Sequence, residues 1–326
     1  MVYPPLSATI VGVTQPTSAS TTAGLVLALA SSAAFGMSGV LARAMIDSGW
    51  SAGATVTVRI AIGAAVLLIP GLLSLRRRWS RLRAAWPTLI AYGALAVATA
   101  QLGYFYAVTY MQVGVALLIE YTAPVAVIVW LWLRRGQRPS RATVLGAAIA
   151  IAGLFLVLDL TGGVSVSGLG ALWALTAMIG AAAYFVISAD ERVQVPPLTL
   201  AAGGLVVGAV GLSLAGLLGV LPMHAGTADV TLAGHHVSWW VPLVVLGVVT
   251  AALAYSLGIA ASRRLGSRVM SFVALSEVLF AVVFAWLALG ELPSPIQLVG
   301  GVLIVVGVIV VRAGEAATRS EETVLG

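Results

Sequence analysis

The chain has 326 residues, of which 60% are hydrophobic and only 9% are charged. A soluble domain carries roughly a quarter charged residues, because its surface has to be solvated by water. The composition therefore excludes an ordinary soluble protein and predicts a chain that has lipid as its main solvent. The net charge of +6 comes from Arg residues in short clusters between apolar runs, which is a membrane topology signal and predicts no nucleic-acid partner. Cys is absent, which excludes disulfides, thiolate metal sites and a cysteine nucleophile.

Apolar runs bounded by turn residues or charges follow one another along most of the chain. Each has about the 20 residues that a bilayer crossing needs, and helices satisfy the backbone in lipid. The sequence therefore predicts an all-α integral membrane protein with ten transmembrane helices. Residues 1–23 are rich in Ser, Thr and Pro and have no basic residue for a signal peptide, so we expect a disordered N-terminal tail there, and a C-terminal tail at 313–326. The predicted helices are 24–45, 52–74, 87–107, 112–133, 142–160, 168–188, 198–221, 240–261, 269–289 and 295–312.

The Arg residues predict how the chain is oriented. All but two of the 17 lie in the loops between helices 2 and 3, 4 and 5, 6 and 7, or 8 and 9, or beyond helix 10, which are all on one side. The exceptions are Arg43, near the other end of helix 1, and Arg59, inside helix 2. Because positive loops stay in the cytoplasm, we expect a multi-pass protein of the inner (plasma) membrane with both termini cytoplasmic.

An internal repeat relates the two halves of the chain at a fixed offset of 154 residues. It indicates a first repeat at 24–160 and a second at 168–312. Five helices per repeat is an odd number, so the two repeats must cross the membrane in opposite directions. Inverted repeats are the architecture of secondary transporters; the alternative is an old duplication with no mechanistic role. The matching pairs include Trp86 and Trp240, Trp132 and Trp286, Pro139 and Pro293, Gly146 and Gly300, and Gly153 and Gly307.

The end of the second repeat resembles a known family. The run Leu289-Gly290-Glu291-Leu292-Pro293, followed by Gln297-Leu298-Val299-Gly300-Gly301, is similar to the loop and last helix of EamA-type proteins of the drug/metabolite transporter superfamily. Glu277 matches a family glutamate fourteen residues before Glu291, although Val278 replaces the usual following proline. The resemblance covers roughly residues 24–312 and implies a ten-helix export-type carrier with a central cavity. It implies no particular substrate.

Helix 4 carries a second, shorter resemblance. Pro124 occupies the proline position of the family, while Ala123 replaces its preceding acidic residue. The run Glu120-Tyr121-Thr122-Ala123-Pro124 is similar to the corresponding segment of threonine/homoserine exporters. This likeness points to amino-acid export.

Three ionisable residues lie well inside predicted helices, away from the helix ends: Arg59, Glu120 and Glu277. Such residues are costly in a bilayer, about 2.5–3.5 kcal/mol each, and usually serve function. In the repeat alignment Glu277 falls on Ala123, three residues from Glu120, so both glutamates could face one cavity from opposite halves. One would then couple protons and the other would bind a substrate ammonium group. In the other interpretation Glu120 forms a structural ion pair with Arg59, and we favour this structural role for Arg59.

Polar and aromatic residues in the middle of the helices are candidates for substrate binding. Gln101 and Tyr104 are three residues apart, so they share one face of a helix. An aromatic-lined pocket with few polar groups suits small organic ligands, although aromatic residues also fill cores. The candidates are Phe35, Gln101, Tyr104, Glu120, Tyr121, Trp173, Tyr184, Tyr255 and Ser256.

The sequence points away from enzymatic chemistry. We predict no catalytic residues, no cofactor and no metal site, since His224, His235 and His236 match no standard ligand spacing and no Walker A sequence is present. The leading hypothesis is a secondary transporter of a small-molecule substrate, exporting amino acids or related metabolites by alternating access with proton coupling. The alternatives are a multidrug or organic-cation exporter and a membrane enzyme or lipid-handling scaffold. Import against export, and a homodimer against a monomer in the bilayer, stay open.

Overall fold

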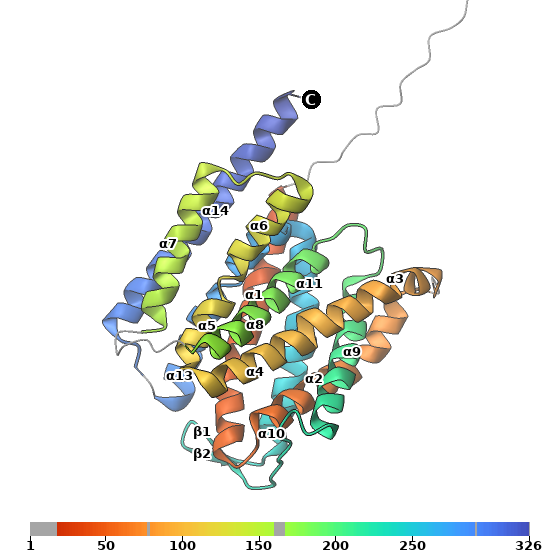
Figure 1. Ribbon diagram of the computed structural model, residues 1–326, viewed down its shortest axis with the longest axis vertical. Helices are drawn as coiled ribbons and strands as arrows, with labels where there is room; N and C mark the ends of the chain where they lie inside the picture. The colour runs from red at the N-terminus through yellow and green to blue at the C-terminus, as the bar shows by residue number, and fades with distance from the viewer. Residues whose placement is uncertain (1–17, 77–78, 160–166, 291, 326) are drawn as a thin grey trace, which may run out of the picture.

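The structure is a computed structural model that describes residues 18–76, 79–159, 167–290 and 292–325. Helices dominate the fold, and one short hairpin lies at the end of the molecule opposite to the C-terminus (Figure 1). We refer to residues 18–159 as the first half and to residues 167–325 as the second half. The first half contains α1 (Ser18–Asp47), α2 (Ala52–Ser74), α3 (Trp79–Ala91), the π-helix η1 (Tyr92–Thr99), α4 (Ala100–Tyr110), α5 (Val113–Glu120), α6 (Ala123–Arg135) and α7 (Arg141–Val157).

The second half has the corresponding order of elements, with a hairpin inserted. It contains α8 (Gly168–Ser188), α9 (Pro197–Leu217), β1 (Val230–Leu232), β2 (His235–Val237), α10 (Trp240–Gly247), the π-helix η3 (Val248–Leu253), α11 (Ala254–Leu265), α12 (Ser267–Val273), α13 (Ser276–Leu289) and α14 (Pro295–Leu325).

Nine helical segments within the described residues are long and apolar enough to cross a membrane. This confirms an all-helical integral membrane protein. The remaining predicted helix, 142–160, corresponds to α7, which has 17 residues. At 1.5 Å per residue it is about 26 Å long, slightly short of the roughly 30 Å hydrocarbon thickness.

Both predicted tails need correction where the structure describes them. Helix α1 begins at Ser18, inside the stretch 1–23 that we expected to be disordered, and residues 1–17 lie outside the described residues. Helix α14 continues through the predicted C-terminal tail to Leu325. The polar composition of residues 313–325 indicated a tail, but Ala, Glu and Arg are good helix formers even where the chain has left the apolar region.

Two of the long apolar helices are broken in the middle. A turn at Tyr121 and Thr122 separates α5 from α6, and a turn at Ala274 and Leu275 separates α12 from α13. Pro124 explains the first break, since it has no N–H for the carbonyl of Glu120. The second break has no proline. The two turns lie at equivalent positions of the repeat to within one residue, because 275 − 121 = 154.

Two other helices contain a π-helical segment, also at equivalent positions. Segment η1 ends at Thr99 and η3 ends at Leu253, and 253 − 99 = 154. Each runs directly into a regular helix, α4 or α11, whose first residues carry candidate site side chains. π-Helical segments are rare and often occur at functional sites.

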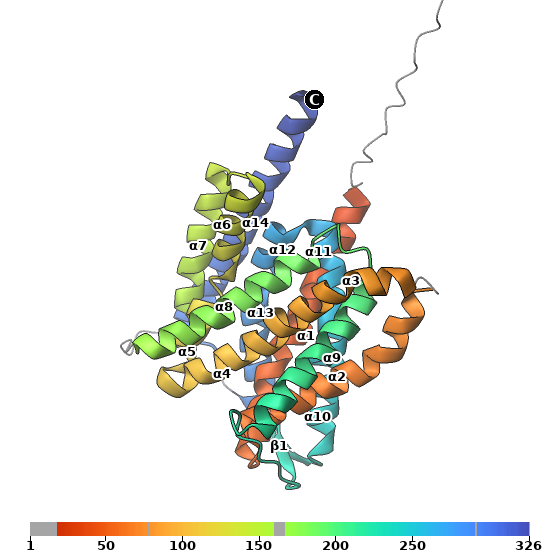
Figure 2. The same cartoon turned by 45° about the vertical axis from the view of Figure 1, so that its right-hand side comes forward.

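Helices α7 and α14 lie side by side at one edge of the molecule and run in opposite directions (Figures 1 and 2). Glycines allow the close approach, because a Cβ on Gly146 would lie 2.7 Å from the carbonyl oxygen of Gly307. A Cβ on Gly153 would lie 2.6 Å from the carbonyl oxygen of Gly300. The offset of 154 exchanges these two contacts, so the crossing has the symmetry of a two-fold axis between the helices.

The hairpin β1–β2 was missed by the sequence prediction. Its strands pair antiparallel through Val230 and Val237, and Ala233 and Gly234 turn between them with positive φ angles of 51° and 76°. Such a two-residue turn matches the twist of the strands. The hairpin holds His235 and His236 at the surface, while the backbone of His224 binds Ser51 at the start of α2. Among the described residues, no three His, Asp or Glu side chains come close enough to hold a metal ion.

Candidate functional site

The two helix breaks bring two acidic side chains together in the interior. Glu120 is the last residue of α5, and Glu277 lies in the first turn of α13. The hydroxyl of Tyr121, in the turn after α5, donates a hydrogen bond to Oε1 of Glu277 at 3.2 Å. Glu120 and Glu277 also interact electrostatically. The site therefore joins the first half to the second half through acidic groups.

Arg59 supplies a positive charge to this site, but not as an ion pair with Glu120. Its Nη2 donates to the carbonyl oxygen of Thr250 in η3 at 2.7 Å, and its guanidinium lies 6.0 Å from the ring centre of Phe35. The predicted ion pair with Glu120 is wrong, since none of the ion pairs within 4.0 Å among the described residues contains Arg59. Arg59 interacts electrostatically with Glu277 over a longer distance. Its Nε is buried and has no hydrogen-bond partner in the structure.

An aromatic group forms one wall beside Arg59. The ring of Phe35 meets that of Tyr255 edge-on, with 5.1 Å between centroids, and Tyr184 lies 5.6 Å from Tyr255 in the same manner. The side chain of Gln101 interacts with Tyr255. Gly258 leaves room for the Tyr184 hydroxyl, because a Cβ there would lie only 1.9 Å from that oxygen. The aromatic wall thus depends on three helices, α1, α8 and α11.

The polar members of the site keep accessible surface although they lie deep in their helices. Arg59, Gln101, Glu120, Tyr121 and Glu277 are all half-buried rather than buried. Arg59, Glu120, Tyr121 and Glu277 interact with one another, and Gln101 joins them through Tyr255. Their partial exposure leaves polar atoms available to a ligand. We call these five residues, with Phe35, Tyr184 and Tyr255, the central site.

Three predicted residues lie outside the central site or at its edge. Trp173 stacks on Tyr106 at 4.8 Å, and the hydroxyl of Tyr106 donates to the carbonyl of Val220. The hydroxyl of Ser256 donates to the carbonyl of Ala252 in its own helix at 2.7 Å. Tyr104 packs in the apolar cluster that contains Trp173, although it also interacts with Glu120. Among the contacts that the structure describes, Trp173 therefore packs on an aromatic ring and Ser256 makes a hydrogen bond to the preceding turn of the helix.

Sequence analysis missed two polar residues next to the aromatic wall. Tyr92 is fully buried at the start of η1, with its ring 6.1 Å from that of Tyr184. Ser31 is buried on α1 and donates to the carbonyl of Ala254 at 2.8 Å. Both residues interrupt apolar runs, which was the available signal. It was not decisive, because single hydroxyl groups are common in membrane helices.

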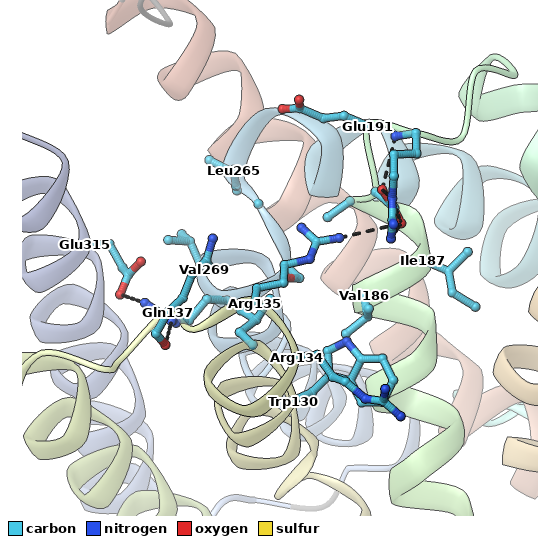
Figure 3. Close-up of a pocket in the computed structure, with 17 residues that line it drawn as sticks. Trp130, Arg134, Arg135, Gln137, Val186, Ile187, Glu191, Leu265, Val269 and Glu315 are labelled. Carbon is cyan, nitrogen blue, oxygen red and sulfur yellow. Dashed lines mark hydrogen bonds and ion pairs between the residues drawn. The ribbon is translucent and has the colours of Figure 1, made fainter. Parts of the chain in front are cut away.

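A pocket of ≈ 890 Å³ lies at the Arg-rich end of the bundle, some distance from the central site. Figure 3 shows Glu315 on one side of it, Ile187 on the other, and Arg134 and Arg135 of α6 between them. Arg134 lies 5.2 Å from the ring centre of Trp130. Asp190 has its pKa held below the usual range by its hydrogen bonds from Arg192, and also by the charge of Arg135. We call this the arginine pocket.

The fold and the apolar helices define the class: this is a multi-pass membrane protein. The sequence profile of the EamA-like transporter family matches it twice, over residues 22–159 and 168–313. The chain therefore belongs to the EamA-like transporter family. Family membership implies a small-molecule substrate and a place in the lipid bilayer, and it points to a transporter rather than an enzyme. Glu291, part of the motif that suggested the family, lies outside the described residues.

Two known proteins are similar to most of the chain. The "Probable terminal-alkyne amino-acid exporter" of Streptantibioticus cattleyicolor is 26% identical over 286 residues, which cover 87% of this chain and 91% of the relative. A solved crystal structure superposes with a TM-score of 0.72 at 24% identity, over 93% of this chain and 99% of its own. The crystal structure supports the fold alone.

Proposed function

We propose that this chain is a secondary transporter that exports amino acids or related small metabolites by alternating access, coupled to protons. The observation that carries the proposal is the central site, where Glu120, Glu277 and Arg59 face one another without an ion pair between Arg59 and either glutamate. Ionisable groups inside a membrane protein mark substrate and proton pathways. Interrupted helices next to them are typical of transporter binding sites.

We further propose that ten helices form two inverted five-helix repeats, at 24–160 and 168–312, with α7 as the fifth crossing. The paired helix breaks, the paired π-helical segments and the antiparallel crossing of α7 and α14 support this proposal. So does the double match to the family. Two such halves can rock against each other around a site on their interface.

The charges of the central site suit a zwitterion. An α-amino acid carries a carboxylate, which a guanidinium binds well, and an ammonium group, which a carboxylate binds. Arg59 would take the carboxylate through nitrogens that Thr250 does not use, and the glutamates would take the ammonium group. The name of the relative as an amino-acid exporter supports this substrate class. A multidrug or organic-cation exporter is the second candidate, but Arg59 would repel a cation that has no carboxylate.

The helix ends suggest different roles for the two glutamates. Glu277 lies at the start of α13, where the helix dipole favours a negative charge, and it accepts the hydrogen bond from Tyr121. Glu120 lies at the end of α5, where the dipole opposes a negative charge. We therefore assign the exchanged proton to Glu120 and the standing negative charge to Glu277.

The orientation follows from the charged loops. We propose that the Arg-rich end faces the cytoplasm, with both termini, in the inner membrane. The exposed apolar side chains of the outer helices, such as Leu298, Val302 and Ile309 on α14, would then face lipid or a second copy of the chain. A homodimer stays an open prediction.

Transport by the purified protein in liposomes tests this function. With a pH difference imposed across the vesicle membrane, we expect saturable movement of at least one labelled α-amino acid against its own concentration gradient. Protein-free vesicles are the control. Absence of flux for all common amino acids, with the protein folded and correctly inserted, would reject the proposal, and flux of organic cations alone would favour the second candidate.

A further inference from the structure

Buried apolar side chains form part of the lining of the arginine pocket, and we call them its floor. Leu131, Leu265 and Val269 line the pocket and belong to the same buried cluster as Val127 and Val273. Val269 on α12 precedes Glu277 on α13 by eight residues, across the break between the two helices. The pocket and the central site therefore lie at different levels of the same two interrupted segments, α5–α6 and α12–α13, with this apolar layer between them.

One group of charges at the pocket rim crosses from the first half to the second. Arg135 at the end of α6 lies 3.6 Å from Asp190, which follows α8. Arg192 holds the same carboxylate in place through Nη2 at 2.7 Å and Nε at 3.0 Å. Figure 3 shows the Arg135 guanidinium pointing toward this carboxylate across the pocket.

A second group, more deeply buried, also joins the halves. Arg268 on α12 pairs with Glu315 on α14 at 2.5 Å, with side-chain exposures of 9% and 14%. Glu315 also accepts a hydrogen bond from Thr143 at the start of α7, and Arg268 donates to the carbonyl of Gln137 before α7. The floor of the pocket therefore lies between two charge clusters, each with partners in both halves.

The opposite end of the molecule is joined differently. Ser51 and Trp50, before α2, bind backbone carbonyls of the loop before β1, at Pro222, His224 and Gly226. These contacts are hydrogen bonds between neutral groups. The Arg-rich end differs because charged side chains link the halves there. Arg135 pairs with Asp190 across the halves, and the Arg268–Glu315 pair of the second half is hydrogen-bonded to Gln137 and Thr143 of the first half. Removal of one partner of a buried pair leaves an unpaired charge.

We infer that the arginine pocket is the mouth of the transport path at the Arg-rich end, and that Arg135–Asp190 and Arg268–Glu315 are the gate that holds its apolar floor closed. This inference rests on the proposed function, since it takes the central site as the place to which the path leads. In it the structure represents a state closed at this end. Opening separates Arg135 from Asp190, releases the Arg268–Glu315 pair from Thr143 and Gln137, and parts the apolar layer between the pocket and Glu277.

Spin-label distances test the gate directly, because the chain has no Cys of its own. Cysteines replace the exposed residues Arg138 and Gln194, one in each half at the Arg-rich end, and are labelled for distance measurement in lipid nanodiscs. We expect one short distance in the parent, and a second, longer population in Glu315→Gln and, to a smaller degree, in Asp190→Asn. The control Arg43→Gln removes an exposed pair with Asp47 at the other end of α1 and should leave the distance unchanged.

A charge exchange distinguishes opening of the gate from unfolding of the protein. The double variant Arg268→Glu with Glu315→Arg should regain the short distance that Glu315→Gln loses, because it restores the pair in reverse. If Glu315→Gln and Asp190→Asn both keep the parent distance, the gate is rejected. The distance needs no substrate, so a chain that moves no amino acid but still opens on loss of Glu315 would reject the proposed function and keep the gate.

Discussion

Arg59 illustrates how one side chain can be identified from the sequence while its contacts are not. An Arg in an apolar helix needs either a compensating charge or a functional role, and the sequence suggested Glu120 as its ion-pair partner. The structure binds Arg59 to the Thr250 carbonyl and sets it beside Phe35 instead. Thr250 belongs to a π-helical segment, whose altered hydrogen bonding leaves carbonyls available. No pattern in the sequence indicated that acceptor.

We expect Arg59→Gln to change substrate selectivity more than folding. The variant should lose its preference for an α-amino acid over the amine that lacks the carboxylate, because the guanidinium is the carboxylate's partner. Transport of both compounds, measured as kcat/KM in liposomes, checks this. We expect at least a tenfold fall in the ratio, which corresponds to about 1.4 kcal/mol, a modest value for a charged hydrogen bond. An unchanged ratio in Arg59→Gln would remove Arg59 from the binding site; Arg43→Gln is the control.

Asp190 should make the protein's stability depend on pH at the acid end. The pKa of its carboxyl is lowered in the folded chain, chiefly by the hydrogen bond from Arg192. Its stabilising contribution is therefore complete above the unfolded pKa and is lost as the pH falls through the folded value. Melting temperatures of the parent and of Asp190→Asn should differ at about pH 6 and approach each other as the pH falls below about 4. A difference that persists or grows in acid would contradict this assignment.

The helices themselves were predictable because an apolar run of membrane length permits little else. Their interruptions were not. Pro124 is a residue that can break helix 4. The break between α12 and α13 has no proline, and an apolar run looks the same whether the helix is straight or broken. The π-helical segments leave no periodic signal for the same reason. The hairpin β1–β2 was missed because the loop was judged by its polar residues and not by its turn at Ala233 and Gly234.

The crossing of α7 and α14 should depend on its glycines. A Cβ on Gly153 would lie within 2.7 Å of two backbone atoms of α14, which have little freedom to move. We expect Gly153→Ala to destabilise the protein by about 1–3 kcal/mol through overpacking. Unfolding in mixed micelles, followed by Trp fluorescence, measures it.

Gly39 on α1 provides the matched control for Gly153. Nothing lies within 4 Å of a Cβ built there, so Gly39→Ala should be neutral or stabilise the helix by up to about 1 kcal/mol. Equal stability of the two alanine variants would mean that close contact at this crossing is not needed.

At the level of the whole molecule, the pattern of Arg residues and the offset of 154 were the informative features. Both are long-range properties that survive an error of several residues at each helix end. They predicted the orientation and the inverted repeat, and they led us to pair the two glutamates, whereas the apolar runs predicted the helical membrane fold and the motif around Glu291 pointed to the family. They gave no information on the arginine pocket, because it forms where Asp190, Arg268 and Glu315 meet from distant parts of the chain. Arg192 was counted only as a loop charge, although its neighbour Asp190 was the signal for a pair.

The predicted orientation can be tested with single cysteines in this Cys-free chain. Gln194→Cys lies at the Arg-rich end and Ala225→Cys lies in the loop before β1, and both positions are exposed. In intact cells a membrane-impermeant thiol reagent should label position 225 and spare position 194, which should react only after the cells are opened. Labelling of both positions in intact cells would contradict the assignment of the Arg-rich end to the cytoplasm.

Coupled flux in liposomes tests the central claim most directly, that Glu120 and Glu277 form one proton-coupled site. With an amino acid that the parent carries, movement of the substrate and of protons is recorded in the same vesicles. We predict that Glu120→Gln still exchanges labelled for unlabelled substrate but no longer accumulates it with a pH gradient, and that Glu277→Gln loses both activities. The exposed control Asp229→Asn, in the loop before β1, should keep both. Full proton-driven accumulation by Glu120→Gln and Glu277→Gln would contradict the account.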